Sequence, residues 1–294
     1  MFDGWFRSDG MMRAVSQMIE IKRTLGLQGV ESVADVAVIA EGESMYRARK
    51  SAGLATLTLS NIRRTLAECG CAYDIYSISD FGEIDLDRYR LILFINQYDI
   101  PEDRLRLILE RLSGTGKCAM WLYAPGYATD GVLSAEKISE TVGMTVSESD
   151  ISHGGIAYKN EKMSIEHSAP YFDIVDENAE AIAYFEDGKC AVSSVMRDGY
   201  SSVLAASPNI PSALLRDMAR AAGAFVYSEE NRVYVYANTA TVGVYNATDS
   251  DAVISVREDG VYKDLIEGGE YVASCGKLTL PTKPIRAYLL RKGT

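Results

Sequence analysis

Few residues of this sequence have the type and position that enzymatic chemistry requires. The clearest position for a reactive group follows Lys117–Leu122, an unbroken apolar run typical of a strand covered on both faces of a parallel sheet. In open α/β sheets, a nucleophile stands on the turn just beyond such a strand. Here that turn is Ala124-Pro125-Gly126-Tyr127, which holds no Cys, Ser or His. We therefore predict that this chain has no catalytic residue there.

Other residues with reactive side chains lack the partners that catalysis needs. Cys118 stands at the start of the strand, the wrong end for a nucleophile, and its type is typical of a small buried hydrophobe. His153 and His167 are the only histidines, and neither belongs to a nucleophile motif, so we expect both on the surface or in loops. Carboxylate pairs such as Asp85 with Asp87, or Glu229 with Glu230, are typical of exposed charge.

The sequence also favours no metal and no cofactor. Cys69-Gly70-Cys71 has neither a second cysteine pair nor a nearby His, so a zinc site is not expected. Glu41-Gly42-Glu43-Ser44 places two acids where a phosphate-binding loop needs bare backbone donors. A flavodoxin-like nucleotide site is therefore disfavoured.

Composition limits the partners and the compartment. The chain has 294 residues and a net charge of −11, which disfavours nucleic acids and anionic membranes as partners. It contains no apolar run of about 20 residues and no signal-peptide pattern at its N-terminus. Five cysteines in a long chain fit reduced thiols better than a disulfide framework, so we expect a cytoplasmic protein.

Apolar periodicity predicts alternating strands and helices over the first half of the chain. Expected strands are 33–40, 73–78, 91–95 and 117–122, and expected helices are 55–69, 101–112 and 134–143. This order predicts a doubly wound, mainly parallel α/β sheet. Short β segments follow at 162–166, 181–186, 190–196 and 201–206, which would extend the sheet with antiparallel strands, and a helix begins at Pro211.

From Arg232 onward the helical period disappears. Short β segments alternate with turn signals such as Asp259-Gly260 and Gly268-Gly269. The sequence therefore predicts an α/β domain over 31–230 and a small antiparallel β-sandwich domain over 231–294.

Several short motifs, in order, resemble one known family. They are Trp121–Tyr127, Ile138-Ser139-Glu140, Val142-Gly143-Met144, Ser207–Pro211 and Asp264-Leu265. These motifs resemble the region that follows the catalytic barrel in β-galactosidase-type glycoside hydrolases. That region is a flavodoxin-like, class I glutamine-amidotransferase-like domain, often called the trimerisation domain, with a β-sandwich tail.

The resemblance implies a non-catalytic role in a carbohydrate-metabolising enzyme. Phe2–Phe6 is similar to the segment that leaves the last barrel strand, so residues 1–30 would be a remnant of the link from the barrel. In this family the barrel supplies both catalytic carboxylates. The expected partners are further copies of the chain, with a trimer implied by the resemblance, and the barrel of the parent enzyme. Two alternatives stay open: an amidotransferase-like hydrolase with an atypical nucleophile, and a free-standing carbohydrate-binding protein.

A saccharide is a further candidate partner, because aromatic faces beside amides are common in sugar sites. The predicted rim formed by the strand ends contains Asn96, Gln97, Tyr98, Tyr123 and Tyr127. Of these, Asn96, Tyr123 and Tyr127 are the main candidates for carbohydrate contact. Asp3 and Trp5 join them, because the resemblance implies that their segment lies near the barrel mouth.

Overall fold

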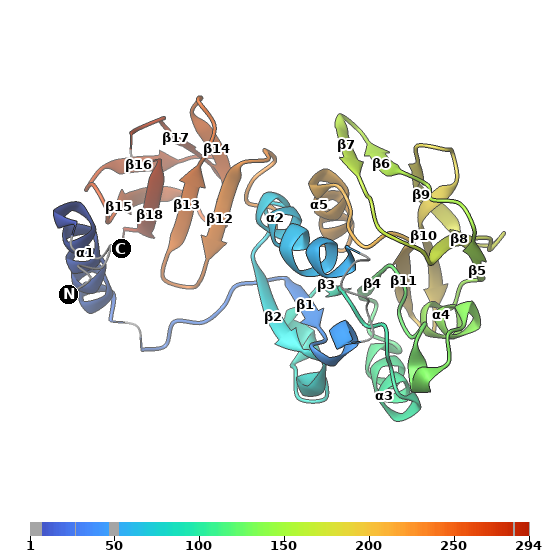
Figure 1. Cartoon of the computed structure of the whole chain (residues 1–294). Coiled ribbons are helices and arrows are strands. Elements are labelled where there is room, and N and C mark those ends of the chain that lie inside the picture. Colours follow the sequence, from blue (N-terminus) through green and yellow to red (C-terminus); the bar gives the residue numbers. More distant parts are fainter. Residues whose placement is uncertain (1–7, 27, 47–52, 285, 294) are drawn as a thin grey trace, which may run out of the picture. The chain divides into compact units, whose positions relative to one another are not determined.

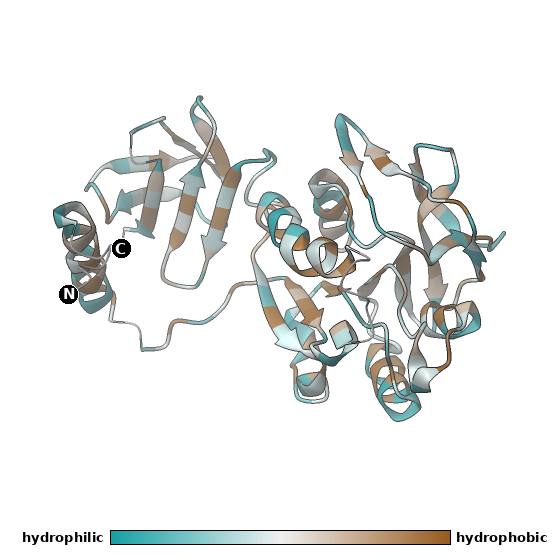
Figure 2. Ribbon diagram, viewed as in Figure 1, coloured by the Kyte–Doolittle hydropathy of each residue, from teal (hydrophilic) through white to brown (hydrophobic). Residues whose placement is uncertain are grey.

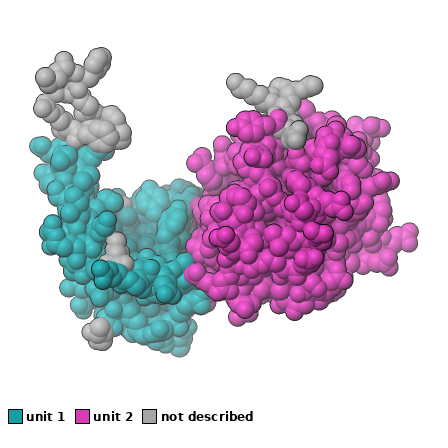
Figure 3. Space-filling view, turned by 90° about the horizontal axis from the view of Figure 1, so that it is seen from below, with its two compact units in different colours: residues 1–33, 232–294 teal, residues 34–231 magenta. Residues whose placement is uncertain are grey.

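The computed structural model describes residues 8–26, 28–46, 53–284 and 286–293. The chain divides into two compact units (Figure 3): residues 1–33 with 232–294 form unit 1, and residues 34–231 form unit 2. The N-terminal helix thus belongs to the same unit as the C-terminal β domain. Within the described residues, none of the helices has the length and apolarity needed to cross a membrane.

Unit 2 is built on a mixed sheet of nine strands, counted over the described residues, in the order β2-β1-β3-β4-β11-β10-β9-β6-β7 (Figure 1). Its parallel half consists of β1 (Val36–Ala40), β2 (Tyr73–Ser77), β3 (Leu91–Phe94), β4 (Cys118–Leu122) and β11 (Tyr200–Ala205). Numbered in chain order, these five strands run 2-1-3-4-5, the flavodoxin-like order. The predicted fold class is therefore confirmed.

The central strands are apolar because both of their faces are covered. All residues of β3 and β4 are buried, and the rings of Phe94 and Trp121 stack at 3.8 Å between neighbouring strands. In Figure 1, α2 (Ile62–Glu68) and α5 (Ser212–Ala221) lie on one side of the sheet, whereas α3 (Glu102–Leu112) and α4 (Ala135–Val142) lie on the other. Figure 2 shows the mixed hydrophobic and hydrophilic residues along these helices, as expected for helices with one side on a core.

Two local predictions need correction. The stretch 201–206, expected among the antiparallel strands, is β11 and runs parallel to β4, with Ser201 opposite Cys118. The chain returns to the parallel half through two hairpins, and the last strand of this return has the direction of β4. The helix expected over 55–69 is not α-helical throughout, because a π-helical segment, η4 (Thr56–Asn61), precedes α2, which starts at Ile62.

The remaining strands of unit 2 are antiparallel. They are β6 (Gly155–Tyr158), β7 (Glu161–Ser164), β9 (Glu180–Phe185) and β10 (Cys190–Arg197), with β5 (Val146–Ser149) and β8 (Tyr171–Ile174) as a separate pair. Short 3-10 turns are η2 (Glu43–Tyr46), η5 (Ile78–Asp80), η6 (Leu86–Arg88) and η7 (Thr129–Gly131).

Unit 1 contains the predicted antiparallel β domain. A five-stranded sheet has the order β12-β13-β18-β15-β16, and β14 pairs with β17. The bounds are β12 (Val233–Ala237), β13 (Val242–Asn246), β14 (Ala252–Ser255), β15 (Gly260–Asp264), β16 (Glu270–Ala273), β17 (Lys277–Leu280) and β18 (Ala287–Lys292). Helix α1 (Asp9–Leu25) belongs to this unit, and Gln17 Nε2 donates to the carbonyl of Ile266 at 2.5 Å.

The turn after α2 yields a test of the packing in unit 2. Gly70 has φ +75°, and a Cβ there would collide with the carbonyl oxygen of Ser228, a backbone atom that cannot rotate away. We expect Gly70→Ala to lower the free energy of unfolding by more than about 2 kcal/mol in urea titrations. Gly223→Ala is the control, because its φ is +90° but nothing lies within 4 Å of the added Cβ. Its cost should be about 1 kcal/mol, and equal costs for the two variants would contradict the predicted collision.

Candidate functional site

The candidate site is the crest of the sheet, defined here as the edge where the parallel strands reach their carboxyl ends. In a 2-1-3-4-5 sheet, ligands bind at the crest between the first and third strands, where the chain order reverses. In this protein that position is filled. Asn96 Oδ1 accepts from the N–H of Glu41 at 2.8 Å, and Asn96 Nδ2 donates to the carbonyl of Glu41 at 2.6 Å.

Asn96 and Gln97 therefore lie inside the crest and not on an exposed rim. Both are buried, and Gln97 Nε2 donates to the carbonyl of Ile39 at 2.9 Å. The phenol of Tyr98 is also enclosed, 3.4 Å from Thr58 Oγ1, and burial raises the pKa of Tyr98 to about 12. The amides that the sequence suggested for sugar contact are bonded to the backbone of the protein itself.

The residue directly after β4 occupies the position of a nucleophile elbow. It is Tyr123, with φ +69°, a left-handed conformation that is rare for a bulky side chain. The phenol is buried, and its hydroxyl donates to the carbonyl of Pro170 at 2.5 Å. Burial raises the pKa of Tyr123, so the hydroxyl stays protonated. The strained backbone of a nucleophile elbow is thus present, but the side chain on it is an un-ionised phenol.

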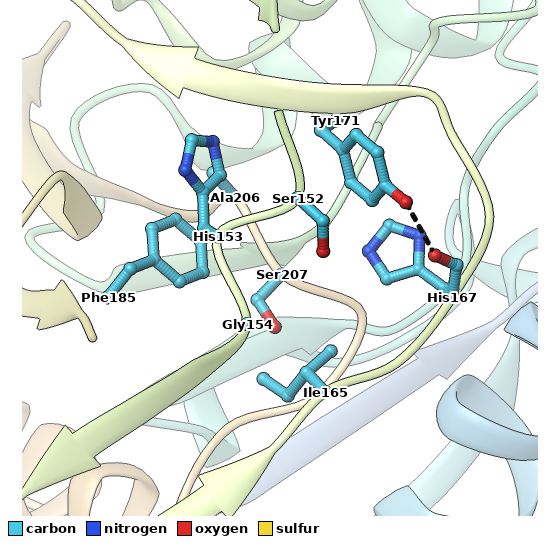
Figure 4. Close-up of a pocket in the computed structure, with 9 residues that line it drawn as sticks. All are labelled: Ser152, His153, Gly154, Ile165, His167, Tyr171, Phe185, Ala206 and Ser207. Carbon is cyan, nitrogen blue, oxygen red and sulfur yellow. Dashed lines mark hydrogen bonds between the residues drawn. The ribbon is translucent and has the colours of Figure 1, made fainter. Parts of the chain in front are cut away.

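The segment 165–171 lies over this elbow. The ring of His167 meets the ring of Tyr123 edge to face at 5.0 Å, and Tyr171 Oη donates to the carbonyl of His167 at 2.9 Å (Figure 4). The space left beside them is a cavity of about 10 Å³, enough for about one water molecule. It is lined by Ser152, His153, Gly154, Ile165, His167, Tyr171, Phe185, Ala206 and Ser207. This cavity is too small for a substrate.

The hydroxyl of Ser207 is not poised for attack either. Ser207 follows β11 at the crest, but its Oγ donates to the carbonyl of Asn209 at 2.6 Å within its own turn. Ser207 has the residue type of a nucleophile and lines the cavity, but a serine needs a base to activate it. Among the hydrogen bonds of the described residues, no imidazole accepts the proton of its hydroxyl.

His153 was expected on the surface or in a loop, and the sequence did not indicate that its side chain is buried. It lies in a loop but is buried, stacked on Phe185 with ring centroids 4.7 Å apart. Its Nδ1 is 2.7 Å from Asp187 Oδ2, and its Nε2 is 3.2 Å from Asp173 Oδ1 without the alignment of a hydrogen bond. Burial raises the pKa of Asp187, but hydrogen bonds from His153 and from the N–H of Lys189 outweigh it and hold that pKa below its usual range. Sequence reasoning missed this cluster because its members are far apart in the chain.

The other sequence candidates are structural or lie elsewhere. Cys118 begins β4, and burial raises the pKa of its thiol to about 12, as expected for a core residue. Tyr127 is buried, and burial together with a 2.9 Å hydrogen bond to Glu148 raises its pKa to about 12. Asp3 and Trp5 lie outside the described residues.

No metal centre is visible in the part of the chain that the structure describes, since no group of three or more His, Cys, Asp or Glu side chains could hold an ion there. Cys69 and Cys71 are both buried.

The carboxylate pairs named from the sequence have structural partners. Asp85 accepts from the N–H of Asp87 at 3.2 Å, whereas Glu229 pairs with Arg220. These carboxylates therefore serve turns and ion pairs.

Comparison with solved structures shows what this fold resembles. A catalytic mutant of Gan42B, a GH42 β-galactosidase from G. stearothermophilus, matches 99% of this chain at a TM-score of 0.69 and 19% identity. A β-galactosidase from Bacillus circulans sp. alkalophilus matches 96% at a TM-score of 0.68 and 15% identity. An α-L-fucosidase, isoenzyme 2 from Paenibacillus thiaminolyticus, matches 94% at a TM-score of 0.58 and 11% identity.

This chain therefore has the fold of part of a GH42 β-galactosidase. It covers 45% of each of the two β-galactosidase chains and 51% of the fucosidase chain, so it spans about half of their length. The α/β unit and the β domain agree with a trimerisation-type domain followed by a β domain, as the sequence motifs implied. No protein-family model and no curated protein matches the chain.

The closed crest predicts an unusual titration for His167. Burial lowers the pKa of His167, although its hydrogen bond to the carbonyl of Ser168 opposes the shift. NMR titration should give a midpoint below the value of about 6.5 for an exposed histidine. Because the unfolded chain then binds the proton first, stability should be present above pH of about 6.5 and fall as the pH drops through the folded midpoint.

With only two histidines in the sequence, His153→Gln assigns the two signals. A midpoint for His167 at or above about 6.5 would show that the crest is open to water.

Proposed function

We propose that this chain is a non-catalytic accessory and oligomerisation region of a β-galactosidase-like glycoside hydrolase that acts in carbohydrate metabolism. The observation that carries the proposal is the buried phenol of Tyr123 at the elbow position, hydrogen-bonded to Pro170 under the segment 165–171. A fold that keeps this backbone but closes the crest is suited to assembly and not to turnover.

Catalysis would then belong to a barrel, the partner that the resemblance implies. A retaining glycosidase needs two carboxylates about 5 to 5.5 Å apart across the scissile bond. The buried carboxylates of unit 2 are engaged internally: Glu41 pairs with Arg104 at 2.7 Å, and Glu68 accepts from Arg64 at 3.0 Å. This internal pairing supports placing the reaction outside this chain.

Helix α1 supports a partner for unit 1. No residue of α1 is fully buried, and its apolar residues Met12, Met18 and Ile19 are 53%, 68% and 54% exposed. Apolar side chains grouped on one helix commonly mark an interaction surface. We propose that the barrel of the parent enzyme covers this side of α1.

The two alternatives receive less support. An amidotransferase-like hydrolase needs an activated nucleophile, and the elbow position carries Tyr123. For a saccharide-binding role, the contacts of Asn96, Tyr123 and Tyr127 are internal, and that role for these three residues and for Asp3 and Trp5 remains a proposal. The five cysteines are unpaired, which supports the proposal of a reducing, cytoplasmic location.

The catalytic part of the proposal is tested by turnover. The purified chain, incubated with chromogenic galactosides and separately with glutamine, should release no product above a buffer blank, because the described residues of the crest supply neither an activated nucleophile nor a catalytic carboxylate pair. The control is the Tyr123→Phe variant, which must give the same blank rate. Turnover that saturates with substrate would overturn the proposal.

The assembly part is tested by sedimentation equilibrium. We expect a mass that is a multiple of the 32.2 kDa chain, with a trimer as the form that the family resemblance implies. Association should weaken on dilution, since parts of the proposed interface belong to the barrel. A monomer at the highest soluble concentration would contradict an oligomerisation role for the chain by itself.

A further inference from the structure

Although the crest is closed, unit 2 has a large groove elsewhere, with a volume of about 700 Å³. This lies within the range of about 300 to 1,000 Å³ typical of small-molecule sites. Its walls are η4 and α2, the β6–β7 hairpin, the turn after β11 and the start of α5. The lining residues are Leu57, Ser60, Asn61, Arg64, Thr65, Glu68, Asn160, Glu161, Lys162, Met163, Ser164, Asn209, Ser212 and Asn231.

The floor of the groove is held rigidly by internal hydrogen bonds. Glu161 accepts from the N–H of Ala213 at 3.3 Å and from Asn231 Nδ2 at 2.7 Å. Arg216 donates to the carbonyl of Glu68 at 2.6 Å and to Asn231 Oδ1 at 2.7 Å. The Glu68 carboxylate accepts from Arg64 Nε at 3.0 Å and from Ser212 Oγ at 3.3 Å, so both carboxylates that face the groove are held in place before any ligand arrives.

Asn209 supplies a side-chain donor that makes no hydrogen bond to a described residue. The residue is 3% exposed, and its Oδ1 accepts from Thr65 Oγ1 and from the N–H of Ile210. Among the described residues, no hydrogen bond uses its Nδ2, although Asn209 lines the groove. Nδ2 is not among the enclosed, unpartnered polar atoms of the described residues, so it is accessible from the groove and can donate to water or to a ligand.

The charges of the lining favour a neutral ligand. Two carboxylates, Glu68 and Glu161, are balanced by two cations, Arg64 and Lys162. The N-terminus of α5, which would otherwise attract an anion, already faces the Glu161 carboxylate. Leu57 and Met163 are the only large apolar side chains of the lining, so an apolar ligand would leave most of these polar groups unpaired.

We propose that this groove binds a neutral, polyhydroxylated molecule, a saccharide of one or two rings. Hydroxyl groups are both donors and acceptors, so they can donate to Glu68 and Glu161 while accepting from the amides of Asn209, Asn61 and Asn160. Its lining shares no residue with the small cavity beside Tyr123, and the site does not depend on the proposed assembly role. Because no aromatic side chain lines it, binding rests on hydrogen bonds, and the affinity is expected to be in the millimolar range.

The test is an NMR titration of the purified full chain with lactose, and in separate samples with sodium phosphate and with spermidine. Lactose should shift amide signals of the groove lining saturably, whereas phosphate and spermidine should not. The test variant is a double variant that combines Asn61→Ala and Asn160→Ala. Both asparagines are exposed residues of the lining, and their side chains make no hydrogen bond to a described residue. This double variant should weaken lactose binding about tenfold, the effect of one or two lost hydrogen bonds.

Asn178→Ala is the matched control, an exposed asparagine outside the groove, and it should leave the affinity unchanged. Thermal unfolding checks that all variants are folded. Absence of a saturable lactose shift, binding of phosphate or spermidine in its place, or an unchanged affinity in the double variant would each overturn the proposal. Galactoside turnover tests the proposal that the chain is non-catalytic and has no weight in this binding test.

Discussion

The hydrogen bond from Tyr123 to the carbonyl of Pro170 is the contact on which the crest depends. It joins the end of the buried strand β4 to a segment that leads into β8, and it does so from a residue in a left-handed conformation. Around it the rings of Tyr98, His167 and Phe172 meet the Tyr123 ring edge to face at 5.0 to 5.9 Å. A strained backbone angle persists where surrounding contacts determine it, and here those contacts are packing contacts without any reactive group.

A second closure acts at the neighbouring position of the crest, between β1 and β3. Asn96 joins the ends of β1 and β3 by two hydrogen bonds with Glu41, and Glu41 is in turn paired with Arg104 of α3. The two places where a doubly wound sheet normally offers chemistry, the chain-reversal point and the elbow, are thus both filled by side chains of the protein itself. The open polar groove lies apart from them, between α2, α5 and the β6–β7 hairpin. The chain-reversal point and the elbow are therefore closed, whereas the groove is open for binding.

Features of the fold that depend on a local residue pattern could be predicted from the sequence. Features that depend on contacts with residues far away in the chain could not. Strands β3 and β4 were predicted correctly because full burial on both faces removes polar alternation from Leu91–Phe94 and Cys118–Leu122. The direction of β11 was not predictable, since it is set by pairing with β4, about 80 residues away, and not by its own residues. Asn96 was placed near the correct strand end, but whether its amide meets solvent or backbone depends on Glu41. His153 was missed as a buried residue because Asp173 and Asp187 come from later strands and turns.

The central claim is that the sheet keeps its elbow but has no reactive atom there. The most direct measurement is labelling of the folded chain with a fluorophosphonate and with a glutamine-analogue electrophile, followed by peptide mass spectrometry. The account predicts no stoichiometric adduct on Cys118, Tyr123 or Ser207, with the exposed thiol of Cys275 as the internal control for alkylation. A stoichiometric adduct on any of those three residues, lost on unfolding, would contradict it.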